Sequence, residues 1–271
     1  MNDMTTNTES TQFAELLLST AQLAAITVLE SGGETSRAEE IATIICKSGG
    51  MEAEAIAFPT GIFITLEGGD GHKTTSVVRV KTRVVNLFKV ERANALSRNF
   101  SSGNLSLTEF NSSLKKLRES VIYSKPFILL SMGISAAMFT AVYEQALNWT
   151  LLFDMAVAFI ASISAKAISS SKRMAGSYQF TLTFMSSVII TAIAVFMRSI
   201  VGIGDLNSIL IGSIMPLLPG LSLTNAIRDT VMGDIVSGTV RIVETLFIAI
   251  GIAGGVGIVL ASYISFFGGA V

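Results

Sequence analysis

Residues 216–241 read PLLPGLSLTNAIRDTVMGDIVSGTVR, and they interrupt the most apolar half of the chain with prolines, glycines and charged side chains. A charged side chain at bilayer depth costs roughly 2.5 to 3.5 kcal/mol, so it persists only where it faces a bundle interior or a water-filled cavity. The stretch therefore predicts a membrane domain that holds polar groups inside it.

The sequence around this stretch divides into two unlike parts. Residues 1–125 hold 13 of the 19 Lys and Arg residues and 14 of the 20 acidic residues, whereas residues 126–271 hold six of each and nearly all the long apolar runs. This contrast indicates a soluble first part and a membrane-embedded second part.

Near the N-terminus, residues 13–29 are apolar enough to resemble a signal peptide. No Lys or Arg precedes them, and Glu15 and Gln22 lie among them, so we reject secretion. Their apolar residues recur at helical spacing, which predicts a helix packed on its own domain. Cys46 is the only cysteine, which excludes an intrachain disulfide and suits a cytosolic location.

Five apolar runs in the second part are each long enough to cross about 30 Å of hydrocarbon. The predicted spans cover residues 123–143, 149–168, 178–202, 206–227 and 243–267. The predicted fold is a membrane α-helical protein. Its transmembrane domain has five helices over residues 123–271, and a small cytoplasmic α+β domain over residues 1–122 precedes it.

Basic residues in the connections predict the orientation of these spans. The connection at residues 144–148 has none, the next carries Lys172 and Arg173, and the one after the fourth span carries Arg228 and Arg241. Since basic residues favour the cytoplasmic side, we expect a cytoplasmic N-terminus, with residues 268–271 outside the cell inner membrane.

The soluble part alternates between helical and strand-like patterns. Helices are predicted at residues 13–29, 34–49, 83–98 and 107–120, and strands at 55–58, 62–66 and 74–80, with a glycine-rich turn at 68–71. At the start of the second helix, Thr35 or Ser36 is the expected N-cap and Glu39 the capping-box acid. His72, the only histidine, is expected in an exposed turn, so we predict no catalytic residue, metal or cofactor.

The proline pair is the first part of a candidate substrate or ion path. Pro216 and Pro219 remove two backbone donors within the fourth span, and Gly220 follows them, so we expect a broken helix. Transporters use such breaks to present helix ends to a substrate. A simple packing kink is the alternative.

Charged residues downstream continue the candidate path. Asn225 and Asp229 are four residues apart and share one helix face. Arg228 or Arg241 could bind a carboxylate, while Asp229 or Asp234 holds an ammonium group or a proton. Equally, these arginines and aspartates could neutralise one another in a cytoplasmic loop.

Two further features of the membrane part stand apart from this stretch. Asp154 is too short to reach the interface from within a span, so it is a candidate proton-carrying or substrate-facing acid. Gly251 and Gly255 form a face of small residues that predicts close helix packing.

The order of these elements resembles the threonine/serine exporter family. The resemblance rests on GGETSRAEE at residues 32–40, FPTGIFITL at residues 58–66, the five predicted spans, and residues 219–241. Longer members of that family fuse a cytosolic domain to two membrane halves. Shorter members carry one half and work beside a separate small membrane subunit, which is the form that this chain is similar to.

The resemblance implies an exporter subunit of the inner membrane that moves small polar metabolites, threonine and serine, outward along an ion gradient. In the split form it also implies dicarboxylate export, of which succinate is the example. It implies a small membrane partner subunit and no nucleic acid, and it leaves a homo-oligomer open. Two rivals of another class are a membrane-tethered hydrolase and a non-transporting assembly subunit.

Overall fold

The computed structural model describes residues 2–68, 71–144, 148–171 and 178–267, with side chains for those between residues 11 and 266. They form two compact units. Unit 1 comprises residues 1–120 and 221–242, and unit 2 comprises residues 121–220 and 243–271. Lys172, Arg173 and the tail at 268–271, on which the predicted orientation depends, lie outside the described residues, as does part of the turn at 68–71.

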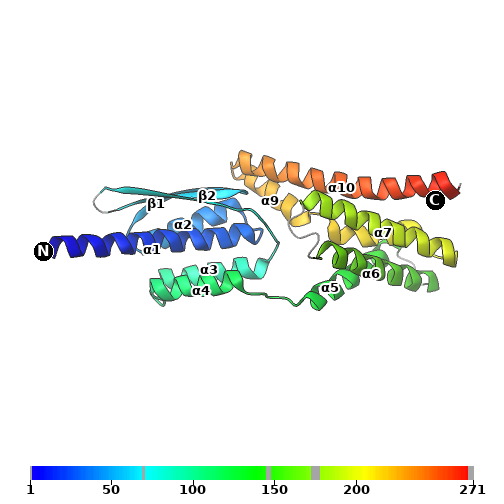
Figure 1. Ribbon diagram of the computed structural model, residues 1–271, viewed down its shortest axis with the longest axis horizontal. Coiled ribbons are helices and arrows are strands. Elements are labelled where there is room, and N and C mark those ends of the chain that lie inside the picture. The colour runs from blue at the N-terminus through cyan, green and yellow to red at the C-terminus, as the bar shows by residue number, and fades with distance from the viewer. Residues whose placement is uncertain (1, 69–70, 145–147, 172–177, 268–271) are drawn as a thin grey trace. The chain divides into compact units, whose positions relative to one another are not determined.

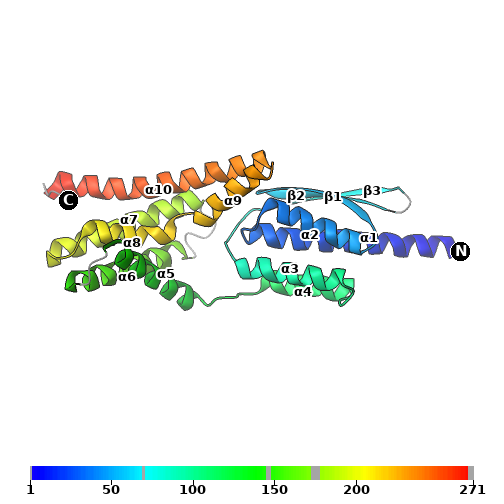
Figure 2. The same ribbon diagram turned by 180° about the vertical axis from the view of Figure 1, so that it is seen from behind.

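Unit 1 begins with two helices, three strands and two more helices (Figure 1). These are α1 (Asn2–Glu30), α2 (Thr35–Ser48), β1 (Glu52–Phe58), β2 (Gly61–Glu67), β3 (Lys73–Arg79), α3 (Leu87–Ser101) and α4 (Leu107–Glu119). The strands form an antiparallel sheet in the order β1-β2-β3. The sheet lies on one side of α1 and α2, and α3 and α4 lie on the other, in both views (Figures 1 and 2).

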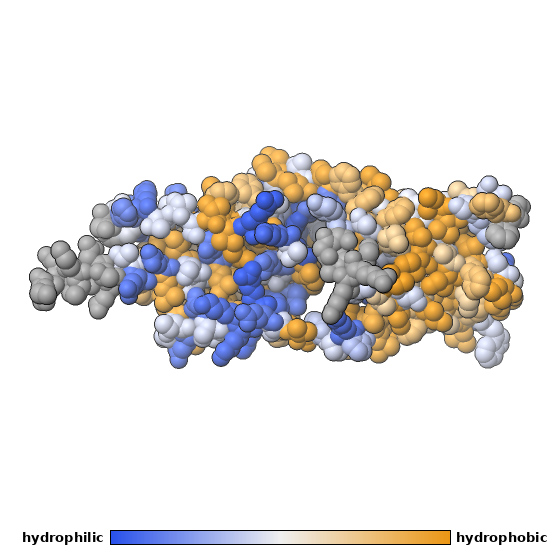
Figure 3. Space-filling model, in the orientation of Figure 1, coloured by the Kyte–Doolittle hydropathy of each residue, from blue (hydrophilic) through white to orange (hydrophobic). Residues whose placement is uncertain are grey.

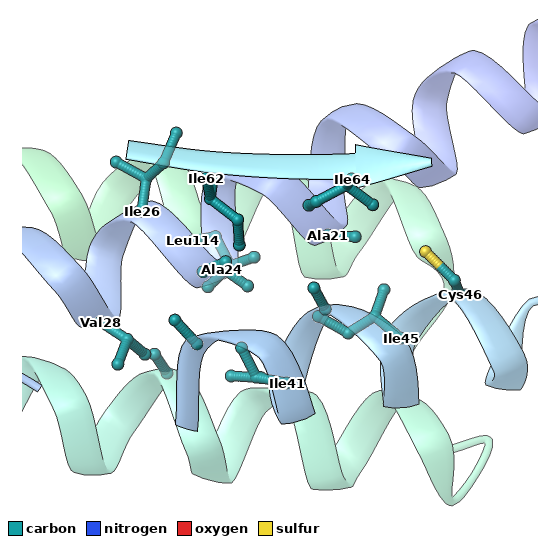
Figure 4. Packing of buried hydrophobic residues seen from close by; sticks show 14 of the residues in the cluster. Ala21, Ala24, Ile26, Val28, Ile41, Ile45, Cys46, Ile62, Ile64 and Leu114 are labelled. Atoms are coloured by element: carbon teal, nitrogen blue, oxygen red, sulfur yellow. The ribbon is translucent and has the colours of Figure 1, made fainter. Parts of the chain in front are cut away.

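The core of unit 1 forms where these layers meet. Ile62 and Ile64 of β2 point toward Ala21 and Ala24 of α1, with Ile45 of α2 nearby (Figure 4). All five are fully buried. Alternate residues of the strands face the other way, which is the period-two pattern expected of a sheet with one covered face.

Helix α1 is long and apolar enough to cross a membrane, but its apolar side lies in this core. Leu17, Ala25 and Val28 have no exposed surface. The prediction of a helix packed on its own domain is therefore confirmed.

Unit 2 contains most of the apolar helices. They are α5 (Lys125–Glu144), α6 (Trp149–Ser169), α7 (Gln179–Val201), α8 (Leu206–Ile214), the 3-10 turn η2 (Met215–Leu217) and, from residue 243, α10 (Ile235–Phe267). By length and composition, α5, α6, α7 and α10 are candidate spans, and so is the broken pair formed by α8 with η2 and α9 (Gly220–Val231). Hydrophobic residues dominate the surface of these helices in Figure 3.

Small residues let the helices of unit 2 approach closely. A Cβ atom on Gly255 of α10 would meet Ser187 Oγ and lie 2.7 Å from the Phe184 carbonyl oxygen of α7, and one on Gly251 would lie 3.2 Å from the Phe180 carbonyl oxygen. The predicted packing face of Gly251 and Gly255 is therefore confirmed. Gly212 of α8 makes a similar approach to Thr140 of α5.

Candidate functional site

The proline pair breaks the helix, as expected. Pro216 lies in η2, Pro219 lies between η2 and α9, and Gly220 begins α9. The two parts of the broken pair are bent by 52°. A packing kink within one continuous helix is therefore excluded. From Leu221 onward the polar stretch belongs to unit 1, so the fourth predicted span is not a single rod.

A tight hairpin returns the chain from α9 to α10. Gly233 occupies the turn with φ of 98°, a conformation that favours glycine. A Cβ atom on Gly238, in the first turn of α10, would meet Thr230 Oγ1 and lie 2.9 Å from the Ala226 carbonyl oxygen. The two glycines thus place the polar faces of α9 and α10 side by side.

The buried centre of this hairpin is an ion pair. Arg241 Nε of α10 lies 3.0 Å from Asp229 Oδ2 of α9, and the side chains are 3% and 0% exposed. Arg241 also donates from Nη2 to the Gly33 carbonyl oxygen at 2.8 Å. Pairing of arginine with aspartate, one of the two sequence interpretations, is thus observed, but in a buried environment rather than in an exposed loop.

Polar groups from both helices contact the segment between α1 and α2. Asn225 Nδ2 donates to the Gly32 carbonyl oxygen at 2.9 Å, and Arg228 forms an ion pair with Glu34. The Thr35 hydroxyl donates to Asp234 Oδ2 at 3.5 Å. Residues 32–35 therefore lie against a group of five polar residues, which are Asn225, Arg228, Asp229, Asp234 and Arg241. We name this set of contacts the polar junction.

The capping prediction for α2 is wrong, because Thr35 and Glu39 bind partners outside the helix. The N-cap is Glu34, which makes no capping hydrogen bond with its side chain. Glu39 instead accepts from the Ala57 backbone N–H of β1 at 2.7 Å. Burial raises the pKa of Glu39, with smaller contributions from Asp234 and Asp229, against the opposing effect of the Ala57 N–H.

A pocket of about 350 Å³ opens beside the polar junction, entirely within unit 1. Helix α3, the segment that enters α2, and α9 all line it. The lining residues are Gly32, Gly33, Glu34, Arg37, Leu87, Val90, Glu91, Asn94, Arg98, Leu221, Thr224, Asn225 and Arg228. The sequence predicted Asn225 and Arg228 as site residues but did not indicate the residues of α3, since their polar spacing is equally typical of a solvated helix face.

Asp154 forms a separate polar site in unit 2. Its side chain is fully buried in α6, and Oδ2 accepts from the Asp205 backbone N–H at 2.9 Å. Asp205 caps α8 by accepting from the Ser208 backbone N–H at 3.0 Å. Glu144, at the end of α5, accepts from the Thr150 hydroxyl of α6 at 3.4 Å. Glu144 was not predicted, because it falls at the end of an apolar run, where a charge is ordinary.

The residues that a hydrolase would need are poorly placed. Cys46 is fully buried, and burial raises the pKa of its thiol to about 11, which disfavours the reactive thiolate. His72 is exposed beside the turn between β2 and β3. Among the residues that the structure describes, no three His, Cys, Asp or Glu side chains are grouped to hold a metal ion.

A comparison with protein families identifies one match. The family model described as "ThrE: Putative threonine/serine exporter" matches residues 19–263, which include both units, the polar junction and Asp154. No curated protein and no solved structure matches the chain significantly.

Proposed function

This chain belongs to the threonine/serine exporter family, and we propose that it is the large subunit of an exporter that moves small polar metabolites out of the cell. The observation that carries the proposal is a proline-broken helix whose second half presents a buried polar face. Half-helix ends and unpaired backbone groups at such a break can bind a polar solute that must cross lipid.

The charges of the polar junction define the class of solute. Arg228 supplies an exposed cationic donor and Asp234 an acceptor, while the buried Arg241 and Asp229 neutralise each other. A zwitterion such as threonine or serine needs one partner of each sign, which these residues offer. A dicarboxylate such as succinate needs two cationic contacts, so it is the alternative substrate.

Asp154 is the proposed site of ion coupling. Its side chain is fully buried in α6, where an acid needs a specific partner or an ion. We propose that Asp154 binds and releases the coupling proton as the exporter cycles, so that an ion gradient drives export.

The exposed helices of unit 2 offer room for a small membrane partner subunit. Within their most apolar stretches, 22% of α5 and of α10 is buried, against 39% of α6 and of α7. Both α5 and α10 therefore leave most of their apolar surface to lipid or to another subunit. We place the complex in the inner membrane, with the N-terminus in the cytoplasm.

Efflux from proteoliposomes tests this function. Vesicles loaded with labelled threonine, serine or succinate would carry the full chain, with and without a co-purified small subunit, under an imposed proton gradient. We expect gradient-dependent efflux of at least one solute, and more of it with the partner present. Absence of efflux under every condition would favour the non-transporting assembly subunit.

A further inference from the structure

We propose that the pocket between α3, α9 and residues 32–37 is a binding site for a small carboxylate-bearing metabolite. It rests on the proposed function and deepens it, because the pocket shares Glu34, Asn225 and Arg228 with the polar junction. Binding there is measured without export, so the two proposals can fail separately.

Ion pairs engage two of the three arginines that line the pocket. Three arginines and two glutamates line the pocket. Arg228 is paired with Glu34, and Arg37 is paired at 2.8 Å with Glu40, which does not line it. Among the residues that the structure describes, the Arg98 guanidinium has no hydrogen bond or ion pair. A ligand carboxylate would give Arg98 the planar, bidentate partner that guanidinium groups favour.

Helix α3 presents a polar stripe to this space. Glu91, Asn94 and Arg98 are spaced i, i+3 and i+7, so they share one face, and all three line the pocket. Asn94 can donate to a carboxylate and also accept from an ammonium or hydroxyl group. Glu91 offers an acceptor for an ammonium group two turns from Arg98. The stripe therefore suits an amino acid and also tolerates a dicarboxylate.

The volume fits a small ligand. Ligand sites usually occupy about 300 to 1,000 Å³, and this pocket, at about 350 Å³, lies at the lower end. Asn225 and Arg228 of α9 line one side, while Glu91 and Arg98 of α3 line another. A bound carboxylate would bridge α3 and α9, and it would therefore stabilise the docking of α9 within unit 1.

Calorimetry on the purified full-length chain in detergent tests this site. The probes are L-threonine, L-serine and succinate, with L-threoninamide as a probe that lacks the carboxylate. We expect at least one of the three carboxylates to bind and threoninamide to bind at least about ten-fold more weakly, because it loses a charge-assisted hydrogen bond. The three arms distinguish an amino acid from a dicarboxylate.

Two variants locate the binding. R98Q should weaken it about ten-fold or more, and R92Q, at an exposed position of the same helix outside the pocket lining, should leave it unchanged. Thermal unfolding of R98Q checks that the variant is folded. Binding that R98Q does not weaken, or no binding of any of the three carboxylates, would overturn the proposal.

Discussion

Breaking the buried Arg241–Asp229 pair should release the α9–α10 hairpin from the rest of unit 1. The substitution Arg241→Met keeps much of the length and apolar stem of the side chain but removes its charge and its hydrogen bond to the Gly33 carbonyl oxygen. Asp229, whose side chain is 0% exposed, then remains as a buried carboxylate without its cation.

The magnitude follows from this burial. Removal of one partner from a buried ion pair costs about 3 to 5 kcal/mol, because the other charge loses both water and its partner. At about 1.4 kcal/mol for each factor of ten, docking of the hairpin would weaken by about two to three and a half powers of ten. The double variant Arg241→Met with Asp229→Leu removes both charges and should recover most of this loss.

Hydrogen exchange on the full-length chain in detergent measures the docking directly. In Arg241→Met, the amides of α9 and of residues 32–35 should exchange faster, while those of β2 should change little. Arg92→Met, at an exposed position on α3, is the matched control. Unchanged exchange in Arg241→Met, or a double variant as destabilised as the single one, would refute the reasoning.

Three other predictions follow from local geometry. Gly255→Val should disrupt the contact between α10 and α7 and lower the unfolding temperature. Gly257→Val, at a position that faces open space, should leave the unfolding temperature unchanged. An equal decrease in both variants would contradict the packing described. The pKa of Glu39 is raised above 4.5, so the folded state binds more protons than the unfolded state, and its stability falls as the pH rises through the raised pKa. Glu39→Gln should therefore flatten the dependence of the unfolding temperature on pH. An unchanged dependence would mean that another group causes it. Asp154→Asn should abolish the response of efflux to a proton gradient, and a normal response would remove Asp154 from ion coupling.

Periodicity and glycine or proline positions were enough to place most elements. The run of β-favouring residues at 62–66 predicts strand β2, which covers Gly61–Glu67. The prolines predict the break before α9, and the glycines of α10 predict close helix packing, which takes place against α7. Each of these signals is local, since it depends on backbone geometry or side-chain volume within a few residues.

The partners of the polar residues could not be predicted in this way. Glu39 has the spacing of a capping box, yet it binds the Ala57 N–H, because strand β1 folds back beside α2. Asn225 and Arg241 reach carbonyl groups at Gly32 and Gly33, about two hundred positions earlier in the chain. Such contacts depend on tertiary structure, and no pattern within either segment indicates the other.

The central claim is that the polar stretch at residues 216–241 serves transport, and a charge exchange across the polar junction tests it most directly. Efflux of the preferred solute would be measured for Arg228→Glu, for Glu34→Arg and for the two combined, after equal reconstitution. We predict that each single variant loses most of its efflux and that the combined variant regains a substantial part, because the ion pair is restored. Single variants that transport as well as the natural chain would contradict the claim.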